Sequence, residues 1–336
     1  MYNYKPIGIH YRKSGFTPRF IEYCEANSIS YKLVNCYNND IIEQLKDCAG
    51  LMWHWSHNDH RDKIIAKQLL TVLSGEDFKI FPDFWNNIAF DDKITQKYLL
   101  EKIEAPLVPT YIFYSKKTAL EWIEKRDFPK IFKLSGGGGS LNVKLIKNKS
   151  QARRIVRKAF GFGFQAVSKS SGLKQRIWVF KRDSSLRSLI HVIKGIVRII
   201  FPRNRTDLLQ KHKGYVYFQE FLPNNKYDIR LVVIGNRCFS LVRKNRENDF
   251  RASGSGILEY DISKVNVNEI KIAFDVAKKL NSSAIAFDFI RDLNENPQIV
   301  EISYAFAVEA YDKCIGYWDE SLNWHEGKQN LQHLIM

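Results

Sequence analysis

The sequence predicts a mixed α/β protein, with an amino-terminal parallel α/β domain followed by two α+β lobes. Residues 1–85 alternate short apolar strands with helices, and this order favours a parallel sheet with crossover helices. Later in the chain, strand patterns follow one another with short turns between them, which is typical of antiparallel sheets. We therefore expect three segments, at residues 1–85, 86–214 and 215–336.

Each expected element follows from an apolar run or a helical period between polar stretches. In the first segment, strands are expected at 7–10, 31–35 and 50–55, and helices at 17–27 and 39–48. The second should hold a helix from Asp92 to about Glu104, a strand at 110–113, a Gly-rich hairpin over 126–147, a basic helix over 149–164 and a strand over 175–180. The third should hold strands at 215–222, 228–234, 237–244, 284–291 and 298–303, and a helix over 268–280.

Composition excludes several classes of protein. The amino terminus lacks the apolar core of a signal peptide, and no apolar run approaches the roughly 20 residues of a membrane span. Five cysteines are scattered without a C-x-x-C pair, which favours reduced thiols in a cytoplasmic protein over a zinc site. The net charge of +16 indicates an anionic partner: a nucleotide, phosphorylated lipid, acidic glycan, nucleic acid or membrane surface. Nucleic acid is disfavoured, since the chain has no RNP-type aromatic motif or recognition helix.

Four consecutive glycines, Gly136–Gly139, lie between two strand-like runs and directly follow Lys133-Leu-Ser. Glycine permits positive φ and lets backbone N–H groups approach a ligand, so this hairpin tip could fold over phosphates as a lid. The spacing fits neither a Walker loop nor a dinucleotide-binding fingerprint, because a strand rather than a helix follows. The alternative is an ordinary flexible hairpin tip.

Two carboxylates interrupt apolar strands near the carboxyl end. Asp288 lies within Ala284–Ile290 and Glu301 within Ile299–Ser303, and the short turn between these runs predicts antiparallel neighbours. A carboxylate in an apolar strand is costly unless it is paired or binds a metal. Two hard oxygen donors on one face would suit Mg²⁺. The alternative is a pair of structural ion-pair acids.

Further polar residues accompany the strands between 217 and 256. The segment Gln219-Glu220-Phe221-Leu222 ends at a proline, as a strand entering a hinge would; its backbone could pair with a purine edge while Glu220 accepts from a ribose or amino group. Clustered guanidinium and ammonium groups suit anionic oxygens, although a solvated basic sheet face is the alternative. This cluster consists of Arg230, Arg243, Lys244 and Arg251.

Taken in order, these residues resemble the ATP-grasp superfamily, in the branch with glutathione synthetase and the ribosomal-protein glutamate ligases. The resemblance covers Asp92–Ser303 and rests mainly on Asp249-Phe-Arg-Ala-Ser253 and the Asp288…Glu301 pair. Residues 1–81 fit that family's preceding α/β domain. A looser resemblance, over 301–327, is to ATP-grasp proteins found with bacterial polysaccharide biosynthesis.

The resemblance implies an ATP-grasp fold whose two lobes clasp Mg-ATP, and a carboxylate–amine ligase that turns ATP into ADP and phosphate through an acyl phosphate. It assigns the metal to Asp288, Glu301 and Ser303, and a catalytic role to Arg230, Arg251 and Lys244. The nucleotide would be held by Lys93, Lys133, Gly136, Gly137, Gly138, Gly139, Gln219, Glu220, Phe221, Leu222 and Asp228. Ser303 departs from the family, which usually has Asn there, and serine is a poorer Mg²⁺ ligand than an amide carbonyl.

An insertion at about 169–213 carries much of the positive charge. Within it, residues 184–201 have helical periodicity, and Arg187, His191, Lys194 and Arg198 fall on one stripe beside a broad apolar face. This pattern is typical of a helix at an anionic membrane surface, and the alternative is a helix that packs on the protein core.

The combined interpretation is a cytoplasmic ligase, peripheral on the inner face of the cytoplasmic membrane, that joins carboxylate and amine substrates. It would attach an amino acid or amine to a cell-surface polysaccharide precursor. The alternative function is a decayed ATP-grasp protein that binds a nucleotide or glycan. Histidines near residues 54–60 could contact substrate or lie on the surface.

Overall fold

The computed structural model describes residues 5–75, 78–137, 142–165, 173, 176–180, 184–200, 211–247 and 249–336. Gly138, Gly139 and much of the insertion predicted at 169–213 therefore lie outside the described residues, as do the side chains of Arg187 and Arg198. The chain forms two compact units, one of residues 1–107 with 222–336 and the other of residues 108–221. The three-segment organisation expected from the sequence stays a prediction.

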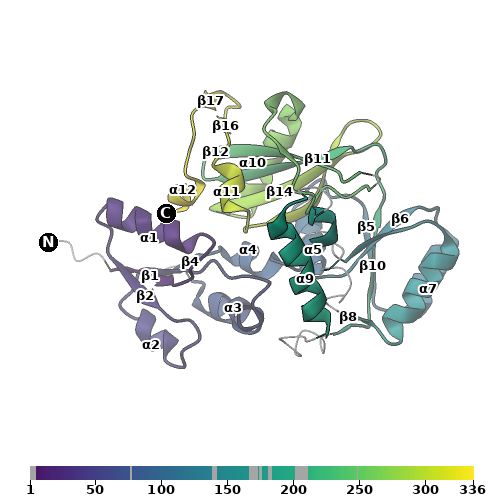
Figure 1. The fold of residues 1–336 in the computed structure, drawn as a ribbon, viewed down its shortest axis with the longest axis horizontal. Coiled ribbons are helices and arrows are strands. Elements are labelled where there is room, and N and C mark those ends of the chain that lie inside the picture. Colours follow the sequence, from purple (N-terminus) through teal and green to yellow (C-terminus); the bar gives the residue numbers. More distant parts are fainter. Residues whose placement is uncertain are drawn as a thin grey trace. The chain divides into compact units, whose positions relative to one another are not determined.

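The first unit begins with a parallel sheet in the order β2-β1-β3-β4. Because the chain steps from β1 to β2 in one direction and then back past β1 to β3, α1 covers one face of the sheet while α2 and α3 cover the other (Figure 1). The elements are β1 (Ile7–His10), α1 (Thr17–Ala26), β2 (Tyr31–Val34), α2 (Ile41–Leu45), β3 (Gly50–Met52), α3 (His60–Leu73) and β4 (Lys79–Phe81). The fourth strand was not expected from the sequence.

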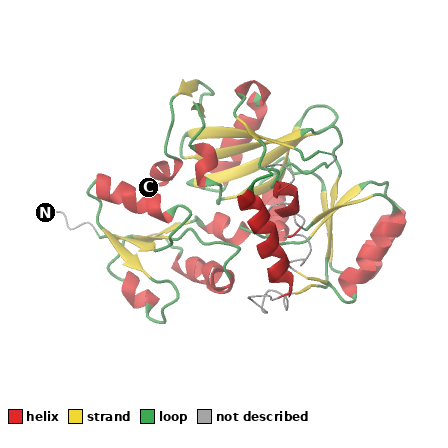
Figure 2. Ribbon diagram, in the orientation of Figure 1, coloured by secondary structure: helices red, strands yellow, loops and turns green. Residues whose placement is uncertain are grey.

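The second unit is built on an antiparallel sheet in the order β5-β10-β6-β7, with the packed helices α6 and α7 contributing to its core (Figure 2). Its elements are β5 (Thr110–Phe113), α6 (Lys116–Glu124), β6 (Lys130–Lys133), β7 (Val143–Ile146), α7 (Lys149–Phe160), β8 (Phe164–Gln165), α9 (Leu186–Ile200), β9 (Lys211–His212) and β10 (Val216–Glu220). The predicted Gly-rich hairpin is confirmed, since β6 and β7 pair antiparallel.

Two sequence predictions in this unit are wrong. The stretch 175–180 was expected as a strand, yet its described residues 176–180 are helical. A short apolar run such as Ile177–Phe180 does not distinguish strand from helix by periodicity. The strand at 215–222 was expected to continue antiparallel into 228–234. Instead β10 pairs with β5 and β6, because Pro223 and Asn224, with φ 68°, end the strand and turn the chain.

The rest of the first unit is centred on a seven-stranded sheet in the order β15-β14-β11-β12-β16-β17, with β13 on β12. Its residues on one face pack with α10, and those on the other face join the core of the amino-terminal sheet. The elements are α4 (Phe84–Ala89), α5 (Lys93–Lys102), β11 (Tyr227–Ile234), β12 (Arg237–Lys244), β13 (Leu258–Glu259), α10 (Val267–Lys279), β14 (Ala284–Arg291), β15 (Pro297–Ser303), α11 (Val308–Tyr311), β16 (Gly316–Asp319), β17 (Trp324–Glu326) and α12 (Leu331–Ile335).

Two further findings bear on the sequence predictions. All five cysteines are free and buried, as expected for reduced thiols. Among the described residues, no helix combines the length and apolar character needed to cross a bilayer.

Candidate functional site

Charged residues of four neighbouring strands share one face of the seven-stranded sheet. Arg230 on β11 lies opposite Asp288 on β14, and Asp288 lies opposite Glu301 on β15. On the other side of β11, Asp228 lies opposite Arg243 on β12. Since side chains alternate between faces along a strand, these five residues project to the same side, away from α10. The predicted meeting of Asp288 and Glu301 on one face is therefore confirmed.

Asp288 is buried between two arginines. Its Oδ1 lies 2.7 Å from Nη1 of Arg230, and its Oδ2 lies 2.7 Å from Nη2 of Arg243. Desolvation favours the protonated acid, but the two guanidinium charges outweigh it, so the pKa of Asp288 is lowered. Asp288 is therefore an ionised carboxylate held between cations.

Arg243 also binds Asp228 through two hydrogen bonds of 2.6 Å, from Nε and from Nη2. Desolvation raises the pKa of Asp228, because Arg243 offsets only part of the cost of burying its charge. Arg243 thus links two acids on different strands. The sequence shows it within the basic cluster, but only the strand register reveals its partners.

Glu301 pairs with Lys93, the first residue of α5. The side chain of Asp92 caps that helix by accepting from the backbone N–H groups of Ile94 and Thr95, which fixes where Lys93 begins it. Nζ of Lys93 lies 3.2 Å from Oε1 of Glu301. Burial would lower the pKa of Lys93, but the charges of Glu301 and Asp91 outweigh it and the pKa is raised. Lys93 is therefore a buried cation beside the carboxylate pair.

Ser303 lies on the same face, opposite Ala286. Its hydroxyl donates to the carbonyl of Ala305 at 3.0 Å and accepts from the N–H of the same residue at 3.1 Å. Arg230 reaches that carbonyl as well, at 3.3 Å from Nη2. The serine thus shapes the turn after β15.

Two of the predicted catalytic cations lie outside this cluster. Lys244 follows Arg243 on β12 and so points to the opposite face, where it pairs with Glu259. Arg251 is held by Asp249, with Nη2 of the arginine 2.5 Å from Oδ2 of the acid. Of the three predicted catalytic residues, only Arg230 joins the Asp288 cluster.

In the second unit, Lys133 ends β6 and is buried, while Gly136 and Gly137 follow it. Gly137 has φ of 109°, and a Cβ there would lie 2.5 Å from the Nδ2 atom of Asn142. That amide donates to the carbonyl of Gly136 at 3.1 Å. A glycine is therefore required at 137, both by backbone conformation and by space.

The predicted hinge segment has its two polar side chains engaged within the second unit. Gln219 is buried and donates to Oγ1 of Thr110 at 3.0 Å. Glu220 accepts from Nζ of Lys130 at 2.6 Å. Phe221 belongs to the second unit and Leu222 to the first, so the chain passes between units at this segment.

His57 is a residue whose position the sequence left open. It lies in the loop after β3, with its ring centroid 5.7 Å from that of Phe90. Burial lowers its pKa, and the charges of Asp91, Lys63, Lys93 and Glu301 also act on it. The loop after β3 therefore places a neutral imidazole near the Lys93–Glu301 pair. The sequence feature that could have pointed to this position is the presence of three histidines within the seven residues 54–60, after a predicted strand.

The helix α9 exposes the apolar side chains of its predicted amphipathic pattern. Its buried residues Ser188 and Gly195 form a narrow packed stripe, and a Cβ on Gly195 would lie within 3.2 Å of both Arg176 and Leu173. The apolar side chains that are exposed are Leu186, Leu189, Ile190, Ile193, Ile196 and Val197. The alternative of a helix packing its apolar face on the core is therefore wrong for these residues.

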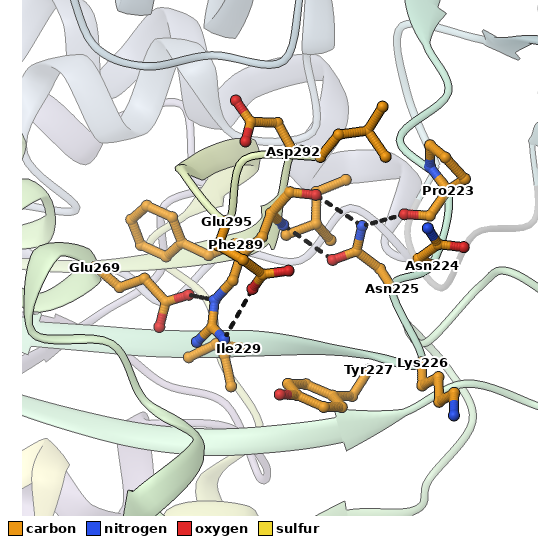
Figure 3. A pocket seen from close by; sticks show the side chains of 13 residues that line it. Pro223, Asn224, Asn225, Lys226, Tyr227, Ile229, Glu269, Phe289, Asp292 and Glu295 are labelled. Carbon is orange, nitrogen blue, oxygen red and sulfur yellow. Dashed lines mark hydrogen bonds and ion pairs between the residues drawn. The ribbon is translucent and has the colours of Figure 1, made fainter.

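A separate pocket lies at the end of the seven-stranded sheet, around the turn between β14 and β15 (Figure 3). Within it, Arg291 pairs with Glu269 at 2.9 Å, and Asn225 exchanges hydrogen bonds with the backbone of Arg291. The pocket contains none of the residues predicted to bind substrate or metal, and we assign it no ligand.

Comparisons with known proteins agree with this architecture. Residues 190–318 match a family model described as a RimK-like ATP-grasp domain. A RimK-domain ATP-grasp protein from Sphaerobacter thermophilus is 13% identical with a TM-score of 0.52, over 88% of this chain and 90% of that one. D-alanine–D-alanine ligase from Bacillus anthracis is 12% identical with a TM-score of 0.53, over 92% of this chain and 91% of that one.

The ATP-grasp ligase PsnB, solved with its minimal precursor, Mg and ADP, is 11% identical with a TM-score of 0.53, and the match covers 92% of both chains. No curated protein matches by sequence. The family model and the solved structures thus agree on the architecture, and together they bear out the resemblance to ATP-grasp proteins, while the looser resemblance over 301–327 stays a prediction. The chain therefore has the ATP-grasp fold, with a RimK-like ATP-grasp domain matched over residues 190–318.

Proposed function

We propose that this protein is an ATP-dependent carboxylate–amine ligase that works through an acyl phosphate. The observation that carries the proposal is the pair of carboxylates Asp288 and Glu301, opposite each other on a charged sheet face and flanked by Arg230, Arg243 and Lys93. Two solved structures of the same fold are those of ligases, D-alanine–D-alanine ligase with ATP and PsnB with Mg and ADP.

The donor set fits Mg²⁺. The described residues contain no group of three or more His, Cys, Asp or Glu that could enclose a metal. Mg²⁺ is commonly held by one or two carboxylates together with substrate phosphates, so a two-carboxylate site suffices. When bound, Mg²⁺ would offset the negative charge of the phosphate oxygens. Asp288 and Glu301 would hold it, and Ser303 would contribute through its hydroxyl or through water.

The proposed reaction has two steps. A substrate carboxylate oxygen attacks the γ-phosphorus of ATP, and the bond to the bridging oxygen breaks to release ADP. An amine nitrogen then attacks the acyl carbon and loses a proton, while phosphate leaves. Because both steps concentrate negative charge on oxygen, fixed cations stabilise them. Arg230 in the first unit would serve the acyl phosphate, with Arg251 and Lys244 as further candidates for the acceptor carboxylate.

We propose that both units contribute further contacts to the nucleotide. Lys93 and Asp228 of the first unit would lie by the phosphates and the metal. In the second unit, Lys133 and the amides of Gly136–Gly139 would contact phosphates, and residues 219–221 with Leu222 would line the purine and ribose. Closure of the glycine hairpin would exclude water, which would otherwise hydrolyse the acyl phosphate.

For the substrate, we propose a precursor of a cell-surface polysaccharide to which an amino acid or amine is joined. The net charge of +16 and the exposed apolar residues of α9 support an anionic, lipid-linked acceptor and attachment to an anionic membrane surface. The enzyme would then be a cytoplasmic protein peripheral on the inner face of the cytoplasmic membrane.

The test is ADP formation with Mg²⁺ during a screen of aminoacyl, uronic-acid and nucleotide-sugar compounds. We expect at least one pair of carboxylate and amine compounds to stimulate ADP release, with loss in Asp288→Ala and Glu301→Ala. Asp275→Ala is a matched control, because Asp275 is an exposed acid on α10 of the same unit. ADP release that survives in both site variants would contradict the proposal.

The second candidate is a binding module without turnover, and the engagement of Ser303 by its own turn favours it. Such a protein would bind ATP and a glycan but release no ADP with any acceptor. Nucleotide binding measured by calorimetry alongside ADP formation separates the two candidates.

A further inference from the structure

The carboxyl edge of the amino-terminal parallel sheet has the geometry of a ligand site. In the order β2-β1-β3-β4, the chain leaves β1 toward one side and leaves β3 toward the other, so the loops after these strands diverge at the edge. Ligands of open α/β sheets bind in the crevice at such a switch point. The two loops here are residues 11–16 and 53–59.

Arg12, in the loop after β1, is fixed by a fully buried acid. Asp62 of α3 pairs with Nη1 of Arg12 and also accepts from the hydroxyl of Tyr37 at 2.6 Å and from the N–H of Ser56 at 2.7 Å. Because three groups already donate to Asp62 and its side chain is fully buried, its negative charge does not repel an anion at the edge. Arg12 remains partly exposed, and its other N–H groups have no hydrogen-bond partner within the described part of the chain.

Two histidines beside Arg12 are held as neutral donors. Nδ1 of His10, at the end of β1, accepts from the N–H of Cys36 at 3.0 Å. Nδ1 of His54, after β3, accepts from the N–H of Phe16 at 3.2 Å. An imidazole that accepts at Nδ1 carries its proton on Nε2. Gly15, with φ of 83°, allows the second bond, since a Cβ there would lie 2.2 Å from Nδ1 of His54.

The edge therefore presents hydrogen-bond donors: the remaining N–H groups of Arg12 and the Nε2–H group of the half-buried His54, whereas His10 itself is buried. Arg12 lies near enough to both histidines for its charge to act on each. Exposed Lys13 adds positive charge in the loop after β1. The two acids beside these loops are both paired, Asp62 with Arg12 and Asp59 with Arg61. A surface of donors whose nearby acids are already paired suits an anionic oxygen group.

We propose that this edge is a second binding site, which does not include Asp288 or Glu301 themselves, for a carboxylate or phosphate group of the substrate that the ligase acts on. The inference rests on the proposed function only for the identity of that substrate, because the donor set itself requires no turnover. The planar fork of Arg12 fixes the anion, and the Nε2–H of His54 orients it.

The test is a titration of the full protein, without ATP, with inorganic phosphate and separately with malonate, at ionic strength matched by chloride. The ¹H–¹⁵N long-range NMR signals of the histidine side chains link the carbon-bound ring protons to the ring nitrogens and so report the protonation and hydrogen bonding of Nε2. We expect saturable shifts of the His54 signals, and the anion that binds more tightly identifies the group. Shifts no larger than those with chloride, for both anions, would overturn the proposal.

Variants add the second measurement. Arg12→Gln should weaken the anion affinity by about tenfold, since a charged bidentate contact is lost. Lys46→Gln removes the same charge from the exposed position that follows α2 and should change the affinity less than twofold. Arg12→Gln removes the ion-pair partner of the buried Asp62 and could destabilise the fold. In that case the double variant Arg12→Met/Asp62→Asn, which removes both charges, replaces it in the measurement. Equal affinity in the Arg12 variants and the wild type would also overturn the site.

ADP formation is measured separately, so the two proposals can fail independently. If the protein releases no ADP but shows Arg12-dependent shifts, the anion site is supported and the ligase proposal is contradicted. If the protein is an active ligase but its histidine signals do not shift with either anion, the ligase proposal is supported and the anion site is contradicted.

Discussion

Asp288 lies directly opposite Glu301 across β14 and β15, at the point where the register of the two strands shifts. Each acid already has its own cations: Arg230 and Arg243 for Asp288, and Lys93 for Glu301. A sheet face on which acids and bases alternate at this density is costly to bury and is stable only while each charge stays paired. Any divalent cation that enters must share these carboxylates with residues that already hold them.

Replacing Asp288 by Asn should lower ADP formation by about 100-fold or more, because a charged oxygen ligand for Mg²⁺ is lost. It should also destabilise the fold, because Arg230 and Arg243 lose a buried counter-charge. ADP release and thermal unfolding are measured on the same preparation. Asp275→Asn, on the exposed face of α10, should leave both near the wild type. Full activity in Asp288→Asn would remove the metal assignment.

Ser303→Asn should lower the Mg²⁺ concentration needed for half-maximal ADP formation, since an amide carbonyl is a better ligand than a hydroxyl. It should cost some stability, because Ser303 bonds both the N–H and the carbonyl of Ala305. Ser303→Ala has the same structural loss without the new ligand and is the matched control. A Mg²⁺ requirement that is identical in the Asn and Ala variants would exclude a ligand role at this position.

Gly137→Ala should raise the ATP concentration required for half-maximal activity by about tenfold, because φ of 109° is strained for alanine and its Cβ would meet Asn142. Lys133→Ala should raise it as well, by removing the buried cation that we propose contacts phosphate. Gly235→Ala is the control for strain alone, since Gly235 also has positive φ but has nothing within 4 Å of a Cβ. Steady-state kinetics that match the wild type in both hairpin variants would make the hairpin a plain surface turn.

The protein should bind anionic vesicles through α9. Each cation near a negative leaflet contributes about 1 kcal/mol, so replacing Arg187, Lys194 and Arg198 by Glu should weaken binding by roughly two orders of magnitude or more. Co-sedimentation with phosphatidylserine vesicles measures this. Lys144, Arg154 and Arg157, exposed on β7 and α7, give a control variant with the same charge change.

Replacing the exposed Ile190 and Ile193 by Ser should weaken vesicle binding too, because their apolar area enters the headgroup boundary. Equal sedimentation of the α9 variants and the wild type, or none by any, would make α9 an exposed helix with another role and would remove the main support for a lipid-linked substrate.

Stability should fall with acid in a window set by two buried histidines. Burial lowers the pKa of His54 to about 3 and that of His10 to about 4, both from 6.5. Between pH 6.5 and about 4 the unfolded chain binds protons that the folded chain does not bind. The free energy of unfolding should therefore decrease as pH falls, by up to about 1.4 kcal/mol per pH unit for each histidine.

His54→Gln keeps an acceptor for the N–H of Phe16 and should flatten this slope in urea unfolding measured at several pH values. His191→Gln, at an exposed position of α9, should leave the slope unchanged. An unaltered slope in His54→Gln would mean that other groups produce the acid sensitivity.

Local sequence patterns were enough to predict that Asp288 and Glu301 lie opposite each other, because a short turn joins two apolar strands that each contain one acid. They were insufficient for Arg243, whose two acids lie on β11 and β14 and are brought to it by register. The sheet to which β10 belongs was equally hidden, since it pairs with strands far away in the sequence. The role of Ser303 in its turn depends on a backbone bend that no residue pattern specified.

The two short strands that flank the insertion have a consequence for the history of this chain. Phe164 pairs with His212 and Gln165 with Lys211, so the points where the chain leaves and re-enters the second unit are neighbours in one ladder. Opposite residues of such a ladder lie about 5 Å apart, a gap that a tight turn of a few residues closes. A shorter connection in place of residues 166–210 would therefore leave the core strands of the second unit where they are. A protein shortened in this way would separate what the rest of the chain does from what this segment contributes.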